Sequence, residues 1–246
     1  MTDDPVLAHE PLPHDTVGLL EGMCSTRAIR RYRDGEAVPP AALRAMLFAA
    51  TRAPSGSNRQ PFRFVVLADG PSAAAAKSVI GAAARRVWSV KEDRDGYTRG
   101  SGADGDSPKA RMARTMRRYV EEFERVPVLV LACLERYRAP HPAEGASVYP
   151  ACQNLLLAAR ALGYGGVMTA FHALVEPELR TLLAIPDDVA LAATITLGRP
   201  EGHHGPVRRR PLAELVFEDA WGRPASFAVD PPGTGHTSAG PPRGPA

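Results

Sequence analysis

The sequence predicts an α+β fold, a mixed α/β sandwich and not a doubly wound parallel sheet. Segments with the pattern of strands alternate with helical segments, but the alternation is irregular. The 246 residues are 44% hydrophobic and 23% charged, as in an ordinary globular protein, and suffice for a large core without disulfides or a structural metal. The net charge of +3 is too small to demand a nucleic-acid or membrane partner.

The composition changes at both ends of the chain. Residues 1–15 are rich in Pro, His and acidic residues, and residues 223–246 are dense in Pro and Gly, so we expect both to be disordered. The folded body is then 16–222. The first residues lack a basic and apolar signal sequence, and the longest apolar run, Val126–Leu134, is far shorter than the ~20 residues that span a bilayer. We therefore expect a cytoplasmic protein.

Helices are predicted where apolar residues recur every three to four positions. They open at Pro39-Pro40, run from Ser72 to about Val90, open again at Ser107-Pro108, and run over Ser147–Leu162 and Pro177–Leu183. Ser107 is a good N-cap, and Gly163 a good C-cap. One face of the third helix collects Met112, Met116, Tyr119 and Phe123, which we expect to pack in the core, the alternative being contacts to a substrate.

Strands are predicted where β-branched and aromatic residues are concentrated. The predicted strands are Phe62–Leu67, Pro127–Leu134, Gly166–Phe171 and Val189–Leu197. The second is apolar throughout, as expected of a strand buried on both faces. The polar, Gly-rich residues 91–107 predict a flexible loop.

Common catalytic and metal-binding motifs are absent from the sequence. It has no GxGxxG after a strand, no Walker loop, no GxSxG and no CxxC. The three cysteines lie beside apolar residues and are expected to be buried thiols: Cys24, Cys133 and Cys152. His203-His204 is expected in a solvent loop and His172 at a strand end, so neither predicts a metal site or a catalytic base.

Three segments carry a more specific signal. The first is Thr26–Tyr32, where Arg27, Arg30 and Arg31 crowd together; it is either a solvated basic face or a clamp for phosphate, which guanidinium groups grip through paired hydrogen bonds. The second, Ala53–Phe62, reads as an ordinary turn or as a loop whose small residues let backbone approach a ligand.

The third segment is Val207–Leu212, with three consecutive arginines. By itself it could bind any polyanion or none. Taken in order, these segments, together with Gln153–Gly163, Ile185–Asp188 and Leu197–Pro200, resemble the FMN-dependent nitroreductase family over nearly all of 16–222.

The resemblance implies a central mixed sheet flanked by helices and an intertwined homodimer with FMN at its interface. Arg27 and Ala28 fall on the family's first flavin motif, with Arg27 reaching the phosphate. Arg30 would lie near the pyrimidine edge of the ring. Arg208 and Arg210 match a late basic pair on the phosphate.

Two further groups of flavin contacts follow from the resemblance. The partner subunit would supply Pro54, Ser55, Gly56 and Asn58. The strand passing the reactive N5 atom would supply Met168, Thr169, Ala170 and Phe171, with a backbone N–H of Ala170 or Phe171 bonding N5.

The sequence departs from the family pattern at two points. Thr26-Arg27-Ala28 stands where the family has Arg-Arg-Ser, so one arginine and one hydroxyl are missing, and Arg31 or Arg209 are the candidates to replace them. Phe62 stands in place of the usual Trp after Gln-Pro, which keeps an apolar ring.

The activity implied is a ping-pong hydride transfer from NADPH or NADH through FMN to a nitroaromatic, a quinone or a similar small acceptor. No side chain is expected to act as acid or base, and no metal is expected. Residues 91–125 would form a lid, and its arginines either attract an anionic substrate or form a solvated face: Arg111, Arg114, Arg117 and Arg118. The alternatives are a specialised flavin enzyme of the same fold (dehydrogenation, dehalogenation or flavin fragmentation) or a non-catalytic FMN-binding protein.

Overall fold

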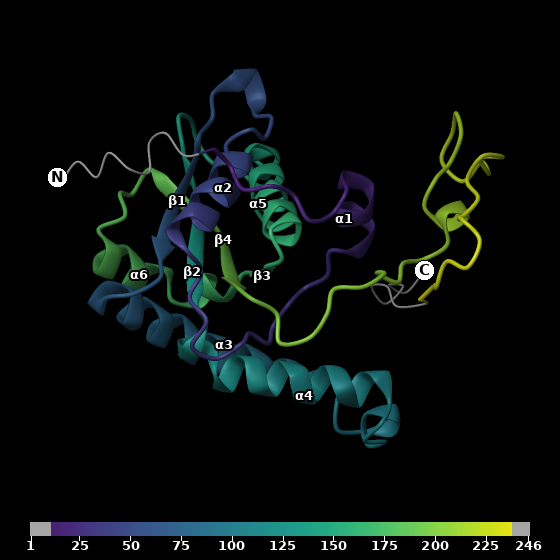
Figure 1. Cartoon of the computed structure of the whole chain (residues 1–246), viewed down its shortest axis with the longest axis horizontal. Coiled ribbons are helices and arrows are strands. Elements are labelled where there is room, and N and C mark those ends of the chain that lie inside the picture. Colours follow the sequence, from purple (N-terminus) through teal and green to yellow (C-terminus); the bar gives the residue numbers. More distant parts are fainter. Residues whose placement is uncertain (1–10, 238–246) are drawn as a thin grey trace.

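The computed structural model describes residues 11–237, and its centre is a four-stranded sheet in the order β1-β2-β4-β3 (Figure 1). The strands are β1 (Phe62–Leu67), β2 (Val128–Glu135), β3 (Gly165–Thr169) and β4 (Val189–Gly198). Six α-helices surround it within the described residues, which confirms the α+β class.

The sheet differs from the expected mixed sheet in one respect: all its strand pairs within residues 11–237 are antiparallel. The connection from β1 to β2 explains one pair. Helices α3 (Pro71–Arg94) and α4 (Pro108–Glu121) form a hairpin that leaves the sheet and returns to the same edge, so the last residue of β1, Leu67, pairs with Leu129 at the start of β2. A strand that begins at the end of the sheet where its neighbour stopped must run antiparallel to that neighbour.

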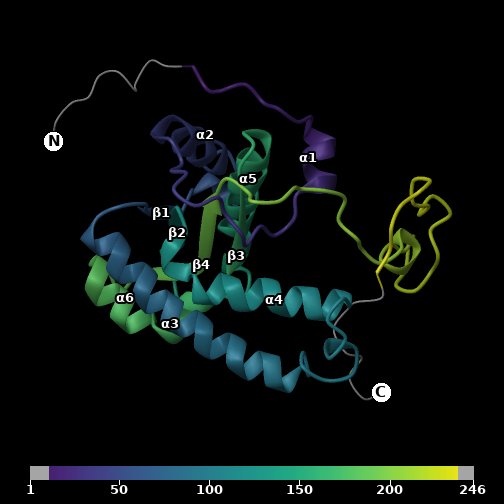
Figure 2. The same ribbon diagram turned by 60° about the horizontal axis from the view of Figure 1, so that its bottom comes forward.

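Helices cover both faces of the sheet, and β2 shows the consequence (Figure 2). Val128, Val130 and Ala132 belong to the core that includes α2 (Pro40–Ala50) and α5 (Tyr149–Ala161). The alternate residues, such as Leu129 and Leu131, face α3, α4 and α6 (Glu176–Leu183). Since side chains alternate along a strand, burial on both faces gives the continuous apolar run seen in the sequence.

The caps predicted from the sequence are present. Ser107 Oγ accepts a hydrogen bond from the Ala110 amide at 3.0 Å, and Gly163 has a φ of +78°, which a glycine adopts without strain. Most other boundaries agree with the prediction to within two residues, and two differences matter for the site. Helix α3 continues to Arg94, into the predicted loop, and β3 ends at Thr169, so that Phe171 begins a short 3₁₀ turn.

The apolar face predicted for α4 is only partly correct. Tyr119 and Phe123 are buried, but Met112 is 42% exposed. The N-terminal part of α4 projects beyond the sheet together with the end of α3 (Figure 1), so Met112 has no core to enter.

One cysteine prediction was wrong. Cys24 lies in α1 (Leu19–Ser25) and is exposed, because this short helix turns Gly22, not the thiol, inward. Cys133 and Cys152 are buried as expected. Burial raises the pKa of the Cys133 thiol to about 11 and that of Cys152 to about 12, so both stay protonated and unreactive at neutral pH.

The last described residues, 207–237, leave the body as an arm (Figure 1, right). The arm folds on itself, with isolated bridges between Phe217 and Pro224 and between Arg209 and His236. The predicted disorder of 1–15 and 223–246 lies partly outside the described residues and stays a prediction. No helix within 11–237 is long and apolar enough to cross a membrane.

Candidate functional site

The arginine-rich segment after α1 is fixed along the edge strand β3. The Ile29 amide donates to the Gly166 carbonyl at 2.9 Å, and the Arg33 amide donates to the Arg199 carbonyl at 2.9 Å. The contact is close because Gly165 has no side chain: a Cβ there would lie 2.5 Å from Ile29 Cγ1. The backbone of the arginine-rich segment is therefore fixed against β3.

Arg30 is a partly buried cation without a carboxylate partner among residues 11–237. Its Nε is buried and unbonded, and the groups that surround it are the phenols of Tyr32, Tyr97 and Tyr119. Burial lowers the pKa of Arg30 below its ordinary value. A desolvated charge without a counterion is costly, so this position favours an anionic ligand.

A buried hydroxyl network supports Arg30. Tyr32 Oη donates to the Ile29 carbonyl at 2.8 Å and lies 2.8 Å from Thr196 Oγ1, which is also 2.9 Å from Tyr119 Oη. Burial raises the pKa of Tyr119 to about 12 and that of Tyr32 well above its usual range. The phenols therefore stay neutral and do not cancel the arginine's charge.

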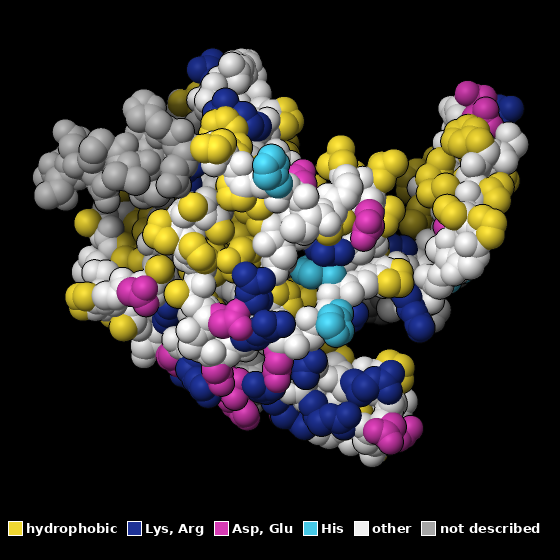
Figure 3. Space-filling view, viewed as in Figure 1, with side chains coloured by type: hydrophobic (Ala, Val, Ile, Leu, Met, Phe, Trp, Pro, Cys, Tyr) yellow, Lys and Arg dark blue, Asp and Glu magenta, His cyan; other side chains and the backbone are white. Residues whose placement is uncertain are grey.

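A pocket of about 160 Å³ opens beside this segment. Its lining consists of Arg27, Ala28, Ile29, Arg30, Arg31, Thr115, Gly202 and His203. Arg31 has a distant carboxylate, Glu201, at 4.0 Å, which a second arginine, Arg118, binds at 2.9 Å. Lys and Arg side chains also gather along α4 (Figure 3), which has five basic residues and one acidic residue, so the surroundings of the pocket carry excess positive charge.

The predicted N5 segment lies at the end of β3, on the edge where the arginine segment begins. Met168 and Ala170 are exposed, whereas Phe171 is buried against Tyr119 at a ring distance of 6.3 Å. Thr169 is half-buried. Arg27–Arg30 and Met168–Ala170 therefore both adjoin the edge strand β3.

His172 follows this segment but is not available for catalysis. It is buried, with Nδ1 at 3.0 Å from Thr194 Oγ1 and Nε2 at 3.1 Å from the Leu191 carbonyl. Its desolvation lowers the pKa of the imidazole. His172 is a structural histidine tied to β4.

The loop with Pro54, Ser55, Gly56 and Asn58 lies elsewhere in the chain. Gly56 donates its amide to Ser147 Oγ at 3.2 Å, just before α5 begins, whereas the arginine segment lies beyond the other end of α5. The 13 residues of α5 span about 20 Å. One chain therefore does not bring its two predicted flavin segments together.

A pocket of about 420 Å³ adjoins this loop. It is lined by Pro54–Gly56 and Pro61, by residues 134–138, and by Ala143, Glu144, Ala146 and Ser147. An ion pair of Arg136 and Glu144, with Nη2 and Oε1 2.6 Å apart, lies in its wall. The predicted role of this loop in flavin binding stays a prediction.

Arg208 and Arg210 lie on the arm and do not line the pocket at Arg27–Arg31. Arg210 pairs with Glu214, with Nη2 and Oε2 2.6 Å apart, and Arg208 is exposed. The arm starts near α1, where the Val207 amide donates to the Cys24 carbonyl at 3.3 Å. Their predicted contact with a flavin phosphate stays a prediction.

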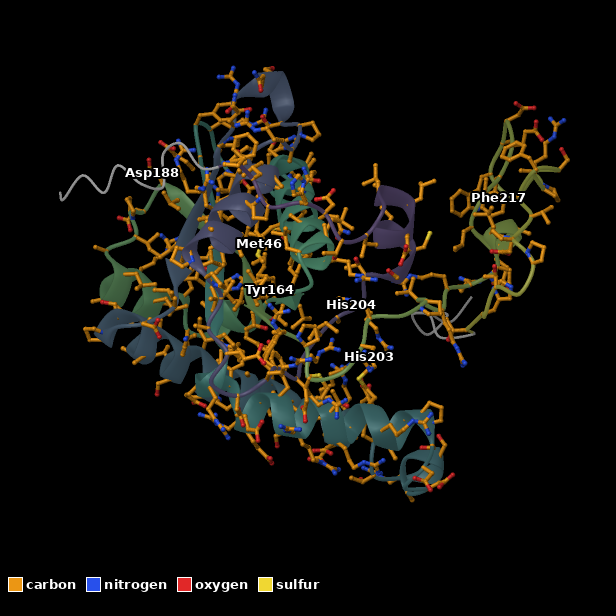
Figure 4. The ribbon with its side chains drawn as sticks, viewed as in Figure 1. Met46, Tyr164, Asp188, His203, His204 and Phe217 are labelled. Atoms are coloured by element: carbon orange, nitrogen blue, oxygen red, sulfur yellow. The ribbon has the colours of Figure 1, made fainter. Side chains whose placement is uncertain are left out.

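His204 does not lie where the sequence predicts it. It was expected in solvent, as His203 is, but it is half-buried beside Tyr164 and Gly165 (Figure 4). The expectation failed because no linear motif reveals that residues 200–204 return to β3. No cluster of three or more His, Cys, Asp or Glu side chains able to hold a metal exists within residues 11–237.

Known proteins resemble this chain over the same region. The Nitroreductase family matches residues 24–199. A protein of Thermus thermophilus named NADH dehydrogenase is 32% identical over 199 residues, which cover 78% of this chain and 91% of that protein.

Solved structures share the fold. A nitroreductase of Desulfovibrio desulfuricans in complex with FMN has a TM-score of 0.60 and 28% identity, covering 83% of this chain and 98% of its own. The NADPH:FMN oxidoreductase of Vibrio harveyi in complex with NAD⁺ has a TM-score of 0.58 at 19% identity, covering 82% and 77%; at that identity the likeness is one of fold.

Proposed function

Because the chain belongs to the nitroreductase family, we propose that it is an FMN-dependent oxidoreductase that takes hydride from NADPH or NADH. The observation that carries this proposal is the unbalanced positive charge at β3, above all the buried and unbonded Nε of Arg30. A phosphomonoester carries a charge of roughly −1.5 to −2, which matches such a site.

The residues present fit FMN. Arg27 would bind its phosphate, and Arg30 would hold negative charge at the pyrimidine edge of the ring, with Ala28 beside them. Met168, Thr169, Ala170 and Phe171 would face the N5 side, where backbone N–H groups of Ala170 or Phe171 can donate. The bound flavin supplies the hydride chemistry, and the protein binds and orients it.

A homodimer would complete the site. Within one chain Pro54, Ser55, Gly56 and Asn58 lie at the start of α5 and the arginine segment follows Ser25 at its other end, so a helix about 20 Å long separates them. The arm supports a second copy as partner, because Trp221 is 93% exposed and Phe227 66% exposed. Large apolar side chains in such an exposed arm indicate an interface.

The acceptor would be a small aromatic compound such as a nitroaromatic or a quinone, reduced in a ping-pong cycle. The loop at 95–107 and α4 would cover the substrate, because Thr115 of α4 already lines the pocket. Nothing in this cycle needs a nucleic acid or a membrane. A cytoplasmic location stays a prediction that cell fractionation would test.

The absorption spectrum tests the proposal. Purified protein should be yellow, and anaerobic NADPH or NADH should bleach its flavin band, with an added quinone restoring it. Yellow protein that dithionite reduces but neither nicotinamide does would favour an FMN-storage role. Colourless protein that takes up no added FMN contradicts the proposal.

A further inference from the structure

His204 is held so that one ring nitrogen is fixed and the other is left without a partner. Nε2 lies 3.0 Å from the Tyr164 carbonyl, which can only accept, so Nε2 carries the hydrogen. Nδ1 is buried and has no hydrogen-bond partner within residues 11–237. A buried polar atom that goes unbonded usually awaits a ligand or water.

The charges around His204 are positive. Arg27 and Arg160 are close enough to lower the pKa of the imidazole, after the larger effect of burial. Arg160 is only 16% exposed, and its nearest carboxylate, Glu21, is 3.8 Å away and 69% exposed. Otherwise the Arg160 guanidinium bonds Ser25 Oγ, a neutral hydroxyl, at 3.2 Å.

The neighbours of Arg27 cannot supply the missing contacts to an anion. Thr26 Oγ1 is already bonded to the Gly22 carbonyl at 2.6 Å, and Ala28 has no polar side chain. Arg27 itself makes no ion pair within residues 11–237. Two further groups near Arg27 come from segments far apart in the sequence: the Arg160 guanidinium, and His204, whose Nδ1 becomes a donor when the imidazole is protonated.

We propose that His204 and Arg160 complete, with Arg27, the site for the phosphate of the bound flavin. This assignment rests on the proposed function. With Nε2–H fixed on the Tyr164 carbonyl, a protonated His204 would donate Nδ1–H to a phosphate oxygen, and the two guanidinium groups would supply the remaining charge. Gly165 makes room for this, because a Cβ there would lie 2.8 Å from His204 Nε2.

The substitution His204→Gln tests the role of Nδ1. A glutamine amide can keep the bond to the Tyr164 carbonyl but places no donor at Nδ1. We measure the dissociation constants of FMN and of riboflavin, which lacks the phosphate, by quenching of flavin fluorescence. We expect FMN affinity to fall about 10- to 100-fold and riboflavin affinity to stay unchanged. Arg160→Gln should also lower the affinity for FMN. The control is His14→Ala, at an exposed histidine near the N-terminus, which should leave the affinities for FMN and riboflavin unchanged.

The outcomes separate this inference from the proposed function. Wild-type protein that binds FMN much better than riboflavin, with the same preference in His204→Gln, overturns the inference alone. Wild-type protein that binds neither flavin overturns both. A variant that keeps its FMN affinity but loses affinity for NADPH and not for NADH assigns the site to the donor's phosphate, and it also overturns the inference.

Discussion

The carbonyl of Gly166 accepts a hydrogen bond of 2.9 Å from the amide of Ile29, so a segment near the start of the chain lies along the edge strand β3. This bond places the backbone of Arg27–Arg31 beside β3, because Ile29 lies in the middle of that segment. The cationic pocket therefore depends on the close approach of Ile29 to β3, which Gly165 permits because it has no side chain.

Gly165→Ala should disturb that approach. Its new Cβ would lie 2.5 Å from Ile29 Cγ1 and 2.8 Å from His204 Nε2, which forces the arginine segment away from β3. We expect a loss of about 1–3 kcal/mol in the free energy of unfolding, typical of overpacking, measured by urea denaturation. The matched control is Gly205→Ala, whose Cβ would meet nothing within 4 Å; equal effects of the two changes would contradict this account.

The substitution Arg30→Met should raise the stability of the flavin-free protein and lower its affinity for FMN. The variant removes a partly buried charge that has no carboxylate partner within 11–237, so the flavin-free protein should become more stable by about 1 kcal/mol. FMN binding should weaken by about 1.5–3 kcal/mol, the usual worth of a hydrogen bond to a charged group. Thermal unfolding without flavin and fluorescence titration with it measure the two effects. A less stable variant would mean that Arg30 has a counterion in the flavin-free protein.

Stability should fall as the pH falls below the ordinary histidine value. His172 is buried and neutral, and desolvation lowers its pKa, whereas in the unfolded chain it titrates near 6.5. Below that pH the unfolded state takes up a proton that the folded state refuses, so the stabilisation present above pH 6.5 is lost as the pH approaches the folded pKa. Urea denaturation at pH 7.5 and 5.5 measures the loss.

His172→Gln provides the comparison for this pH dependence. A glutamine can still bond Thr194 Oγ1 or the Leu191 carbonyl, but it does not titrate. Its stability should therefore change less between the two pH values than that of the wild type, with the shift that remains coming from His204 and other groups. An identical pH slope in both proteins would exclude His172 as its source.

The sequence was most informative where local patterns and burial agree. Phe62–Leu67 was predicted to the residue because its β-forming side chains are bounded by Pro61 and a turn. The exposure of Cys24 could not be predicted, since it depends on which face a short helix turns inward. His204 was missed for a related reason: its environment exists only because Tyr32 bridges Pro200 and brings the following residues back to β3.

The exposed apolar side chains of the arm, residues 207–237, are the strongest indication of a homodimer. Phe217 and Trp221 pack against each other at a tilt, with ring centroids 5.1 Å apart, yet Trp221 is 93% exposed and projects away from the body with the arm. If the partner covers this pair, Trp221→Lys should raise the dimer dissociation constant at least 10-fold, because burial of an aromatic side chain contributes several kcal/mol. Analytical ultracentrifugation measures the dimer dissociation constant. FMN occupancy should fall as the dimer dissociates, because the partner then no longer supplies Pro54–Asn58.

The control is Thr234→Lys, which introduces the same charge at an exposed polar position on the same arm and should leave the dimer intact. A wild-type monomer holding FMN at full occupancy would refute the shared site.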